Sequence, residues 1–139
     1  MIAMVAAALT SVGADAHAQT PATGTFTLAT LNGQALPTAT ETSTRCREEI
    51  VSGAITLEDN GDWEFAYVER KTCGTDVEED REREGGDYVL EGQSVRFSDD
   101  TDEFKADNLD VDELGVGVLS AAGLTITLQD GQTALFFGR

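Results

Sequence analysis

Apolar and polar side chains alternate in short runs along most of the chain. The clearest runs are GTFTL at 24–28, GDWEFAY at 61–67, SVRFS at 94–98 and LTITL at 124–128. A period of two residues places successive side chains on opposite faces of a strand. No long stretch repeats apolar residues at helical spacing, and glycine-containing pairs separate the runs. The pattern predicts an all-β domain of short strands joined by tight turns.

The clearest hairpin has strands near 48–58 and 62–72, on either side of Asn60-Gly61. A two-residue turn at this pair would mix polar and apolar residues on both faces. A three-residue loop, 59–61, with Gly61 in the left-handed region as part of a bulge, places every large apolar residue on one face. Because register follows the hydrophobic pattern, we expect the second arrangement. It makes these pairs: Leu57 with Trp63, Ile55 with Phe65, and Gly53 with Tyr67.

The only two cysteines, Cys46 and Cys73, lie at the open end of this hairpin. In the expected register Cys73 points inward, and Cys46 is one residue out of step. A single bulge near Gly53 or at 48–49 would bring the two cysteines opposite each other. An even cysteine count in a secreted chain predicts a disulfide between them. The alternatives are two buried thiols or a redox pair, and the separation of the cysteines does not match a C-x-x-C redox motif.

Further hairpins follow along the chain. The run 24–33 carries Phe26 and Leu28 on one face and ends at an Asn-Gly turn, before a Thr-rich loop that contains Pro37. Strands 86–90 and 94–98 are expected to meet at Glu91-Gly92. That turn would make two inward pairs, Tyr88 with Val95 and Gly86 with Phe97.

The C-terminal strands complete the predicted sheet. An Asp130-Gly131 turn would pair Ile126 with Leu135 and Leu124 with Phe137. The preceding segment, 113–119, would point its three alternating apolar residues inward: Leu114, Val116 and Val118. About eight to ten strands, each with one apolar face, would leave reactive edges if the sheet stayed open. We therefore expect a small antiparallel up-and-down β-barrel, with a two-sheet β-sandwich as the alternative.

The first residues, MIAMVAAALTSVGADAHAQT, resemble a secretory signal peptide in their pattern. An apolar run is followed by small residues and an A-x-A cleavage site that ends at Ala18. The run is too short to span a bilayer. A positively charged n-region is lacking, which is expected if the natural start lies upstream of Met1. Residues 1–18 are thus expected to be removed, which leaves one domain, 19–139, in the periplasm or outside the cell.

Charge and histidine content narrow the function classes. The chain has a formal charge of −17, and after cleavage nine basic and 25 acidic residues would leave −16. Such a surface repels nucleic acid and anionic lipid. The only histidine, His17, would leave with the signal peptide. Without it the domain has no Ser-His-Asp or Cys-His catalytic system and no imidazole metal site. We therefore expect a protein that is not an enzyme.

Two acidic segments interrupt the alternating pattern. TDVEEDREREGG at 75–86 would place acidic residues at 76, 78, 80, 82 and 84 on one face of an extended chain. Since neither face of this segment suits a core, it is expected to project past the barrel rim or to form a loop. SDDTDEFKADNLDVDE at 98–113 is rich in aspartate, but its spacing does not match known calcium loops. It is interpreted as a solvated rim, and neither a metal nor a cofactor is expected.

The opening pattern, Gly24-x-Phe26-x-Leu28 followed by an N-G-x-x-L-P stretch at 32–37, resembles small secreted bacterial lipocalin-like proteins. They share a cysteine before one strand of a hairpin, an N-G or D-G turn, a second cysteine after it, and a closing aromatic strand that ends in arginine. The resemblance covers most of residues 22–139. It implies a calycin-type barrel that can hold a small apolar ligand. By analogy with the G-x-W and late arginine of lipocalins, it implies that Arg139 lies near Phe26, although Phe26 stands where those proteins have tryptophan.

Two functions compete on this information. A ligand-binding barrel would line its cavity with Trp63, Phe65, Tyr67, Tyr88, Phe97, Leu114, Val116, Ile126 and Phe137. Its ligand would be neutral or cationic, because a buried carboxylate needs a buried cation. An eight-stranded barrel is also just wide enough to be filled by its own side chains. A filled barrel would instead bind a protein, for example as a protease inhibitor, through the 76–84 segment or the 36–45 loop. In either case the protein is expected to be a monomer.

Overall fold

The computed structural model describes residues 22–99, 114–128 and 131–139, and these residues form β-structure without a helix. The ten strands are β1 (Gly24–Leu31), β2 (Gln34–Ala35), β3 (Thr38–Thr42), β4 (Cys46–Leu57), β5 (Asp62–Cys73), β6 (Asp76–Glu91), β7 (Ser94–Asp99), β8 (Leu114–Leu119), β9 (Gly123–Leu128) and β10 (Ala134–Gly138). The expected signal peptide and most of the acidic segment 98–113 lie outside the described residues.

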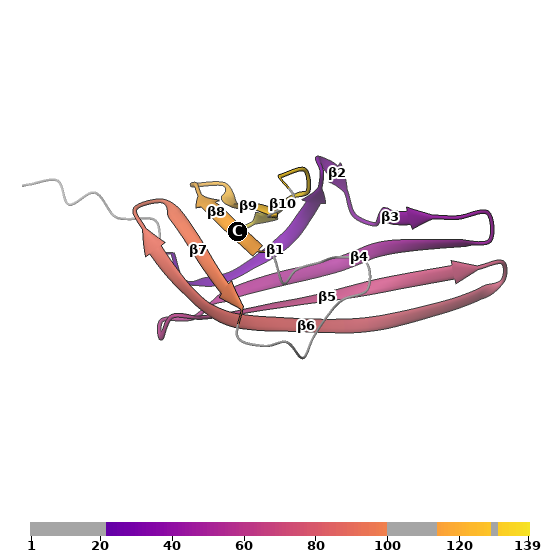
Figure 1. The fold of residues 1–139 in the computed structure, drawn as a ribbon, viewed down its shortest axis with the longest axis horizontal. Coiled ribbons are helices and arrows are strands. Elements are labelled where there is room, and N and C mark those ends of the chain that lie inside the picture. The colour runs from indigo at the N-terminus through magenta and orange to yellow at the C-terminus, as the bar shows by residue number, and fades with distance from the viewer. Residues whose placement is uncertain (1–21, 100–113, 129–130) are drawn as a thin grey trace, which may run out of the picture.

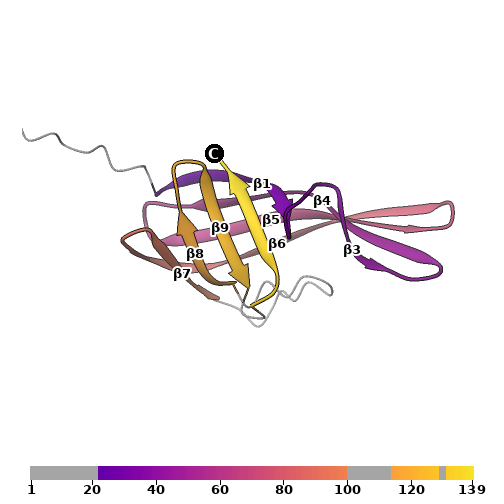
Figure 2. The ribbon, with the colours of Figure 1, turned by 90° about the horizontal axis from the view of Figure 1, so that it is seen from above.

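Eight of the strands close into an antiparallel barrel (Figures 1 and 2). Their order is β1, β10, β9, β8, β7, β6, β5 and β4, and β4 pairs back with β1, where Phe26 lies opposite Ile55. Because closure pairs both edges of the sheet, every barrel strand has a neighbour on each side among the residues that the structure describes. The barrel expected from the alternating pattern is confirmed, and the two-sheet alternative is wrong.

Three strands are longer than the barrel requires. β4, β5 and β6 have 12, 12 and 16 residues, whereas β7 to β10 have five or six. Their excess length projects from one end of the barrel, with β3 paired to the outer part of β4 (Figure 1). We call this projection the arm. It consists of residues 38–49, which contain β3 and its turn into β4, and of residues 68–83 of the β5–β6 hairpin.

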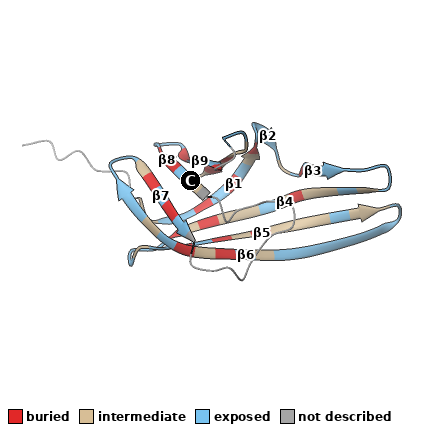
Figure 3. Cartoon of the chain, in the orientation of Figure 1, coloured by how far each residue is buried: buried red, intermediate tan, exposed pale blue. Residues whose placement is uncertain are grey.

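The hydrophobic core lies within the barrel and stops where the arm begins (Figure 3). Its buried apolar residues are Phe26, Leu28, Leu31, Ile50, Ile55, Leu57, Trp63, Phe65, Tyr67, Val95, Phe97, Leu119, Leu124, Ile126, Leu128, Leu135 and Phe137. Every barrel strand contributes to this core or packs against it. Because a fully buried large apolar side chain contributes roughly 1.5–3 kcal/mol, the core stabilises the barrel half of the molecule.

The expected register of the β4–β5 hairpin is confirmed. Leu57 lies opposite Trp63, Ile55 opposite Phe65, and Gly53 opposite Tyr67. A bulge between residues 50 and 52 shifts the register by one, as required to bring the cysteines together. The C-terminal hairpin also pairs as expected, with Ile126 opposite Leu135 and Leu124 opposite Phe137. Residue 130 of its expected turn lies outside the described residues.

The turn between β6 and β7 lies one residue further along the chain than expected. The loop residues are Gly92 and Gln93, so Tyr88 faces Phe97 and Leu90 faces Val95. Gly92 is the first loop residue and has a φ of 63°. A two-residue hairpin turn favours glycine there, and this preference decides between the two registers. The partner of each β6 residue therefore moves by two positions along β7. Because two positions preserve the alternation, the same side chains still face inward.

Strand β8 turns its valines outward, contrary to the expectation. Val116 and Val118 are 48% and 51% exposed, while Gly117 and Leu119 face the core. A register shift between residues 114 and 116 changes which face the alternation presents. A side chain at 117 would come within 2.9 Å of Leu124 and 3.1 Å of Phe97, so only glycine fits beneath these two large residues. Val116 therefore cannot line the interior. The side chain of Leu114 lies outside the described residues.

Candidate functional site

Most expected lining residues lie inside the barrel. Trp63, Phe65, Tyr67, Phe97, Ile126 and Phe137 are all at most 8% exposed. Tyr88 is half-buried, and its hydroxyl donates a hydrogen bond to the carbonyl oxygen of Glu58 at 2.6 Å. Burial, followed by the negative charge of Asp59, raises the pKa of Tyr88 above its usual 10.0.

The aromatic side chains of the interior pack against one another. The Phe65 ring stacks on Tyr67 with centroids 5.0 Å apart and meets the edge of Phe137 at 5.4 Å. Trp63 and Phe97 form a second edge-to-face pair at 5.6 Å. These distances are typical of aromatic pairs in a packed core. This part of the interior is therefore occupied by the chain's own side chains.

Glu84 is the one described charged residue that belongs to the buried set. It is 6% exposed and lies opposite Phe65 on the inner face of β6. The pattern of 75–86 predicted a projecting rim or loop for Glu84 together with the other acids of that segment, and for Glu84 this prediction was wrong. The alternation along the same strand could have placed Glu84 on the inner face, because Gly86 and Tyr88 face inward and lie two and four residues after it.

Arg139 closes one end of the barrel. Its guanidinium carbon lies 5.0 Å from the centroid of the Phe26 ring, within the range of a cation–π contact. This is the arrangement that the resemblance to lipocalins implied, with phenylalanine in place of tryptophan.

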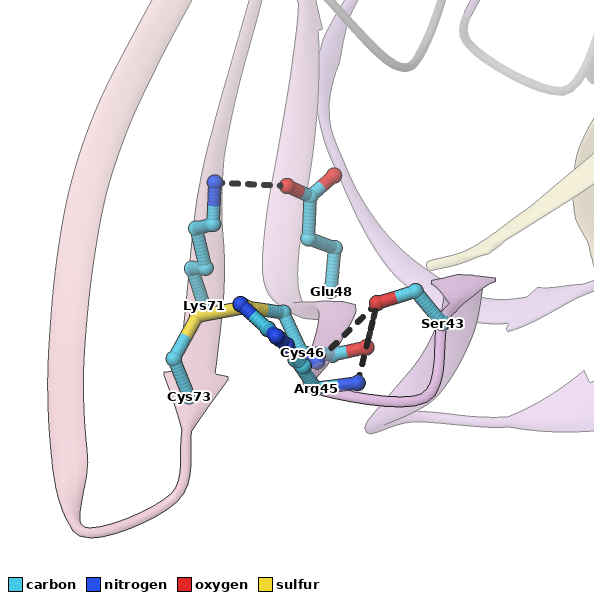
Figure 4. Close-up of a disulfide and its surroundings, with 6 residues drawn as sticks. All are labelled: Ser43, Arg45, Cys46, Glu48, Lys71 and Cys73. Carbon is cyan, nitrogen blue, oxygen red and sulfur yellow. Dashed lines mark hydrogen bonds and ion pairs between the residues drawn. A yellow bond between two sulfur atoms is a disulfide. The ribbon is translucent and has the colours of Figure 1, made fainter.

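The disulfide links β4 to β5 within the arm, which confirms the expected pairing of the two cysteines. Cys46 and Cys73 are cross-strand neighbours, with their Cα atoms 4.2 Å apart and an S–S bond of 2.09 Å (Figure 4). The turn that leads into β4 is fixed by Ser43, whose Oγ accepts hydrogen bonds from the backbone N–H groups of Arg45 and Cys46 at 3.4 and 3.0 Å. The cross-link thus holds together strands that have no core beneath them.

The two faces of the arm differ in charge. Residues directly opposite each other in a ladder share a face of the sheet, so the register shows on which face each side chain lies. The face continuous with the barrel interior carries Glu48, Glu69, Lys71, Asp76, Glu78, Asp80 and Glu82. The outer face carries Arg47, Glu49, Arg70, Glu79, Arg81 and Arg83. The first set is mostly acidic, whereas the second has more basic than acidic side chains.

Ion pairs cross the strands on both faces. On the outer face Arg70 lies between Glu79, at 3.0 Å, and Glu49, at 4.0 Å. On the acidic face the Nζ of Lys71 lies 3.4 Å from a carboxylate oxygen of Glu48. Figure 4 draws this ion pair beside the disulfide. All of these arginine and lysine side chains are one third exposed or more, and exposed pairs contribute only about 0–1 kcal/mol each.

A shallow groove crosses the outer face where the arm leaves the barrel. It is lined by residues 52–54, 66–68 and 81–83 and has a volume of about 350 Å³. The residues of this face that form it are Ser52, Ala54, Ala66, Val68, Arg81 and Arg83. Small side chains on β4 and β5 leave the space, and two arginines of β6 border it. This groove was not predicted from the sequence, because it forms only when three strands lie in register.

The described part of the chain contains no helix with the length and hydrophobicity that a membrane crossing requires. Within the same residues, no three or more His, Cys, Asp or Glu side chains are grouped so that they could hold a metal ion.

The fold defines the class of this protein as a small closed antiparallel barrel of eight strands that carries a disulfide-linked arm. In comparisons with protein-family models, curated proteins and solved structures, none matches the chain. Fold class and candidate site are therefore assigned from the residues and their geometry.

Proposed function

We propose that this protein is a non-enzymatic binding protein that recognises a partner protein through its arm. The observation that carries the proposal is the convergence of two segments on one structural element. The 36–45 loop and the acidic 76–84 segment were separate candidate contact surfaces in the sequence. β3 and β6 bring them to the two sides of the same projecting sheet, separated only by β4 and β5.

The composition of the arm supports a contact role. A sheet that buries almost no apolar surface gains little stability from projecting into solvent. The arm is nevertheless cross-linked by a disulfide and by ion pairs on both faces. A rigid element pre-organised for binding loses less conformational entropy when a partner docks. Stability alone does not account for such an element, whereas recognition does.

Packing inside the barrel favours this surface role over a ligand-binding role. The interior rings that would line a ligand cavity are in contact with each other. A ligand between Phe65 and Phe137 would have to separate them and lose that packing energy. Binding of a small neutral apolar ligand remains a prediction of the lipocalin resemblance, and the arm is the better supported site.

Site-specific photo-cross-linking in the cells that make the protein tests the proposal. Val77 on the arm and Val116 on the barrel are both exposed valines, at 57% and 48%. Each is replaced in turn by a photoreactive phenylalanine derivative. We expect a discrete protein adduct from position 77 that excess unlabelled protein suppresses, and no such adduct from position 116.

A matched charge variant completes the test. Reversal of the exposed arm residue Asp80 to Lys should reduce the adduct at position 77. Reversal of Glu91 to Lys, at the β6–β7 turn of the barrel, changes the net charge equally and should not reduce it. The proposal is wrong if position 77 gives no saturable adduct, or if positions 77 and 116 give the same one.

A further inference from the structure

The arm has one long open strand edge. Residues 76–85 of β6 pair with β5 on one side, whereas β7 pairs with β6 only from Gly86 onward. On its other side, this stretch pairs with no strand among the residues that the structure describes. An open edge presents a row of backbone donors and acceptors that an extended chain can use.

Arginines lie beside this edge on the outer face. Arg81 forms no ion pair with any described residue, and Arg83 has only a 3.5 Å contact to Glu64 while its side chain stays 72% exposed. Both border the outer groove, whose floor is built from Ser52, Ala54 and Ala66. In a chain with a formal charge of −17, these two arginines form a local positive site that attracts acidic groups.

The opposite face of the same edge has the reverse sign. Glu78, Asp80 and Glu82 alternate with the arginines and lie on the acidic face of the arm. A strand added to β6 places its own alternate side chains next to these two rows. The edge therefore fits a strand that carries acidic residues toward the outer face and basic residues toward the acidic face.

We propose that residues 76–85 of β6 bind an extended segment of the partner protein by strand addition, with acidic side chains of that segment paired to Arg81 and Arg83. The inference rests on the proposed function of the arm and adds the chemistry of the partner. Backbone hydrogen bonds supply affinity, and the alternating charges select the segment and its register.

A second copy of this chain in antiparallel pairing is a poor occupant of the edge. If two β6 edges pair antiparallel, the acidic faces of both copies lie on the same side of the joined sheet and their residues become neighbours. Glu78, Asp80 and Glu82 would then meet only other acids of the same row, and like charges opposite each other destabilise a sheet. The charge pattern thus opposes antiparallel pairing of two copies and leaves the edge to a complementary strand.

A synthetic peptide tests the inference directly. The probe has about ten residues, which matches the open edge at strand spacing, and repeats Glu-Lys-Thr-Thr so that glutamate and lysine point to opposite faces. The control peptide has the same composition, but its glutamates and lysines share one face. We expect saturable binding of the probe to the full protein by calorimetry or fluorescence anisotropy, and at least tenfold weaker binding of the control.

Protein variants then locate the site. Arg81→Glu together with Arg83→Glu replaces two exposed attractions by repulsions and should weaken probe binding about tenfold. The control, Arg96→Glu, changes an exposed arginine on the outer face of the barrel and should leave probe affinity unchanged. Circular dichroism and thermal melting confirm that each variant keeps the wild-type fold.

N-methylation of the probe separates strand addition from simple charge attraction. In an added strand, every second backbone N–H group faces β6. Methylation of these nitrogens should abolish binding, whereas methylation of the nitrogens that face away from β6 should be tolerated. Equal binding of both methylated probes, or of probe and control peptide, overturns strand addition.

If no probe binds while the cross-link from position 77 persists, this inference fails and the proposed function stands. If position 77 gives no saturable adduct, the proposed function fails with it.

Discussion

The barrel and the arm share three strands, β4, β5 and β6, but the two regions are stabilised in different ways. β5 begins with Trp63, Phe65 and Tyr67, each at most 3% exposed. Four residues beyond Tyr67 it reaches Lys71, whose side chain is half exposed and paired with Glu48. The backbone ladder between β5 and β6 runs through both regions without a register shift. Regular hydrogen bonding alone therefore does not distinguish a packed core from a solvated sheet.

The two regions differ in the interactions that offset the conformational entropy lost when the chain folds. In the barrel, apolar burial contributes about 25 cal/mol per Å². In the arm, exposed ion pairs contribute about 0–1 kcal/mol each, which is small against about 1–2 kcal/mol per ordered residue. The disulfide at Cys46 and Cys73 lies in the arm, where constraint of the unfolded chain replaces the missing core. Substitutions in the barrel and in the arm should therefore differ in their effect on stability.

Removal of a core side chain should have the largest effect. Phe65→Ala deletes a fully buried ring that contacts Tyr67 and Phe137, and should reduce the free energy of unfolding by about 3–5 kcal/mol. Thr72→Ala, on the same strand within the arm, should change it by less than about 0.5 kcal/mol. Denaturant unfolding of both variants measures the difference. Similar losses from the two variants would contradict the division into barrel and arm.

Removal of the disulfide should act on the arm first. The chain-entropy model assigns about 3–4 kcal/mol to a cross-link that closes a loop of this length. In the double variant Cys46→Ser with Cys73→Ser, we expect faster amide hydrogen exchange at residues 68–83 and little change in β9 and β10. A uniform increase across all strands would mean that the arm and the barrel unfold as one unit. Mass spectrometry of the unreduced protein after alkylation verifies that wild type has no free thiol.

The turn that closes β4 and β5 should tolerate no β-branched residue at its last position. Gly61 has a φ of 92°, and Gly61→Val should destabilise the barrel by about 1–2 kcal/mol because a side chain resists this backbone conformation. Asp59→Val, in the same loop but without positive φ, serves as the control and should have a smaller effect. Thermal melting compares the two, and an unchanged melting temperature for Gly61→Val would refute the turn assignment.

The contact that closes the barrel end should have a smaller effect. Arg139→Ala removes the guanidinium 5.0 Å from the Phe26 ring and should cost about 0.5–1 kcal/mol. Arg139→Lys keeps the charge and should retain part of this stability. Chemical unfolding at moderate salt gives the comparison, and an Ala variant as stable as wild type would show that the contact contributes nothing.

The smallest effect concerns alkaline pH. The pKa of Tyr88 is raised above 10.0, so the folded state holds the phenolic proton more tightly than the unfolded state. Its contribution to stability is therefore complete below pH 10.0 and is lost as the pH rises through the folded-state pKa. Tyrosinate absorbance of wild type minus that of Tyr88→Phe gives the titration of this residue. A Tyr88 pKa at or below 10.0 would contradict the expected direction.

Local patterns in the sequence determined much of the fold. Alternation fixed which face of β4 and β5 is buried, because a one-residue slip would move all the large apolar side chains to the other face. That requirement, together with the loop chemistry at Gly61, also led to the bulge and to the Cys46–Cys73 pairing. These features depend on residues close in sequence or on one hairpin, so the sequence alone could predict them.

Contacts between strands that are distant in the sequence decided the features of the fold that local patterns did not predict. The alternation in β8 favoured Val116 as an inward residue, but Phe97 and Leu124 leave room there only for Gly117, and this reverses the face. The burial of Glu84 and the position of β3 likewise depend on where the barrel ends and the arm begins. The outer groove and the open edge of β6 require three strands in register. Such features depend on which strands become neighbours and how far each extends past them, and those properties exist only once the chain has closed into a barrel.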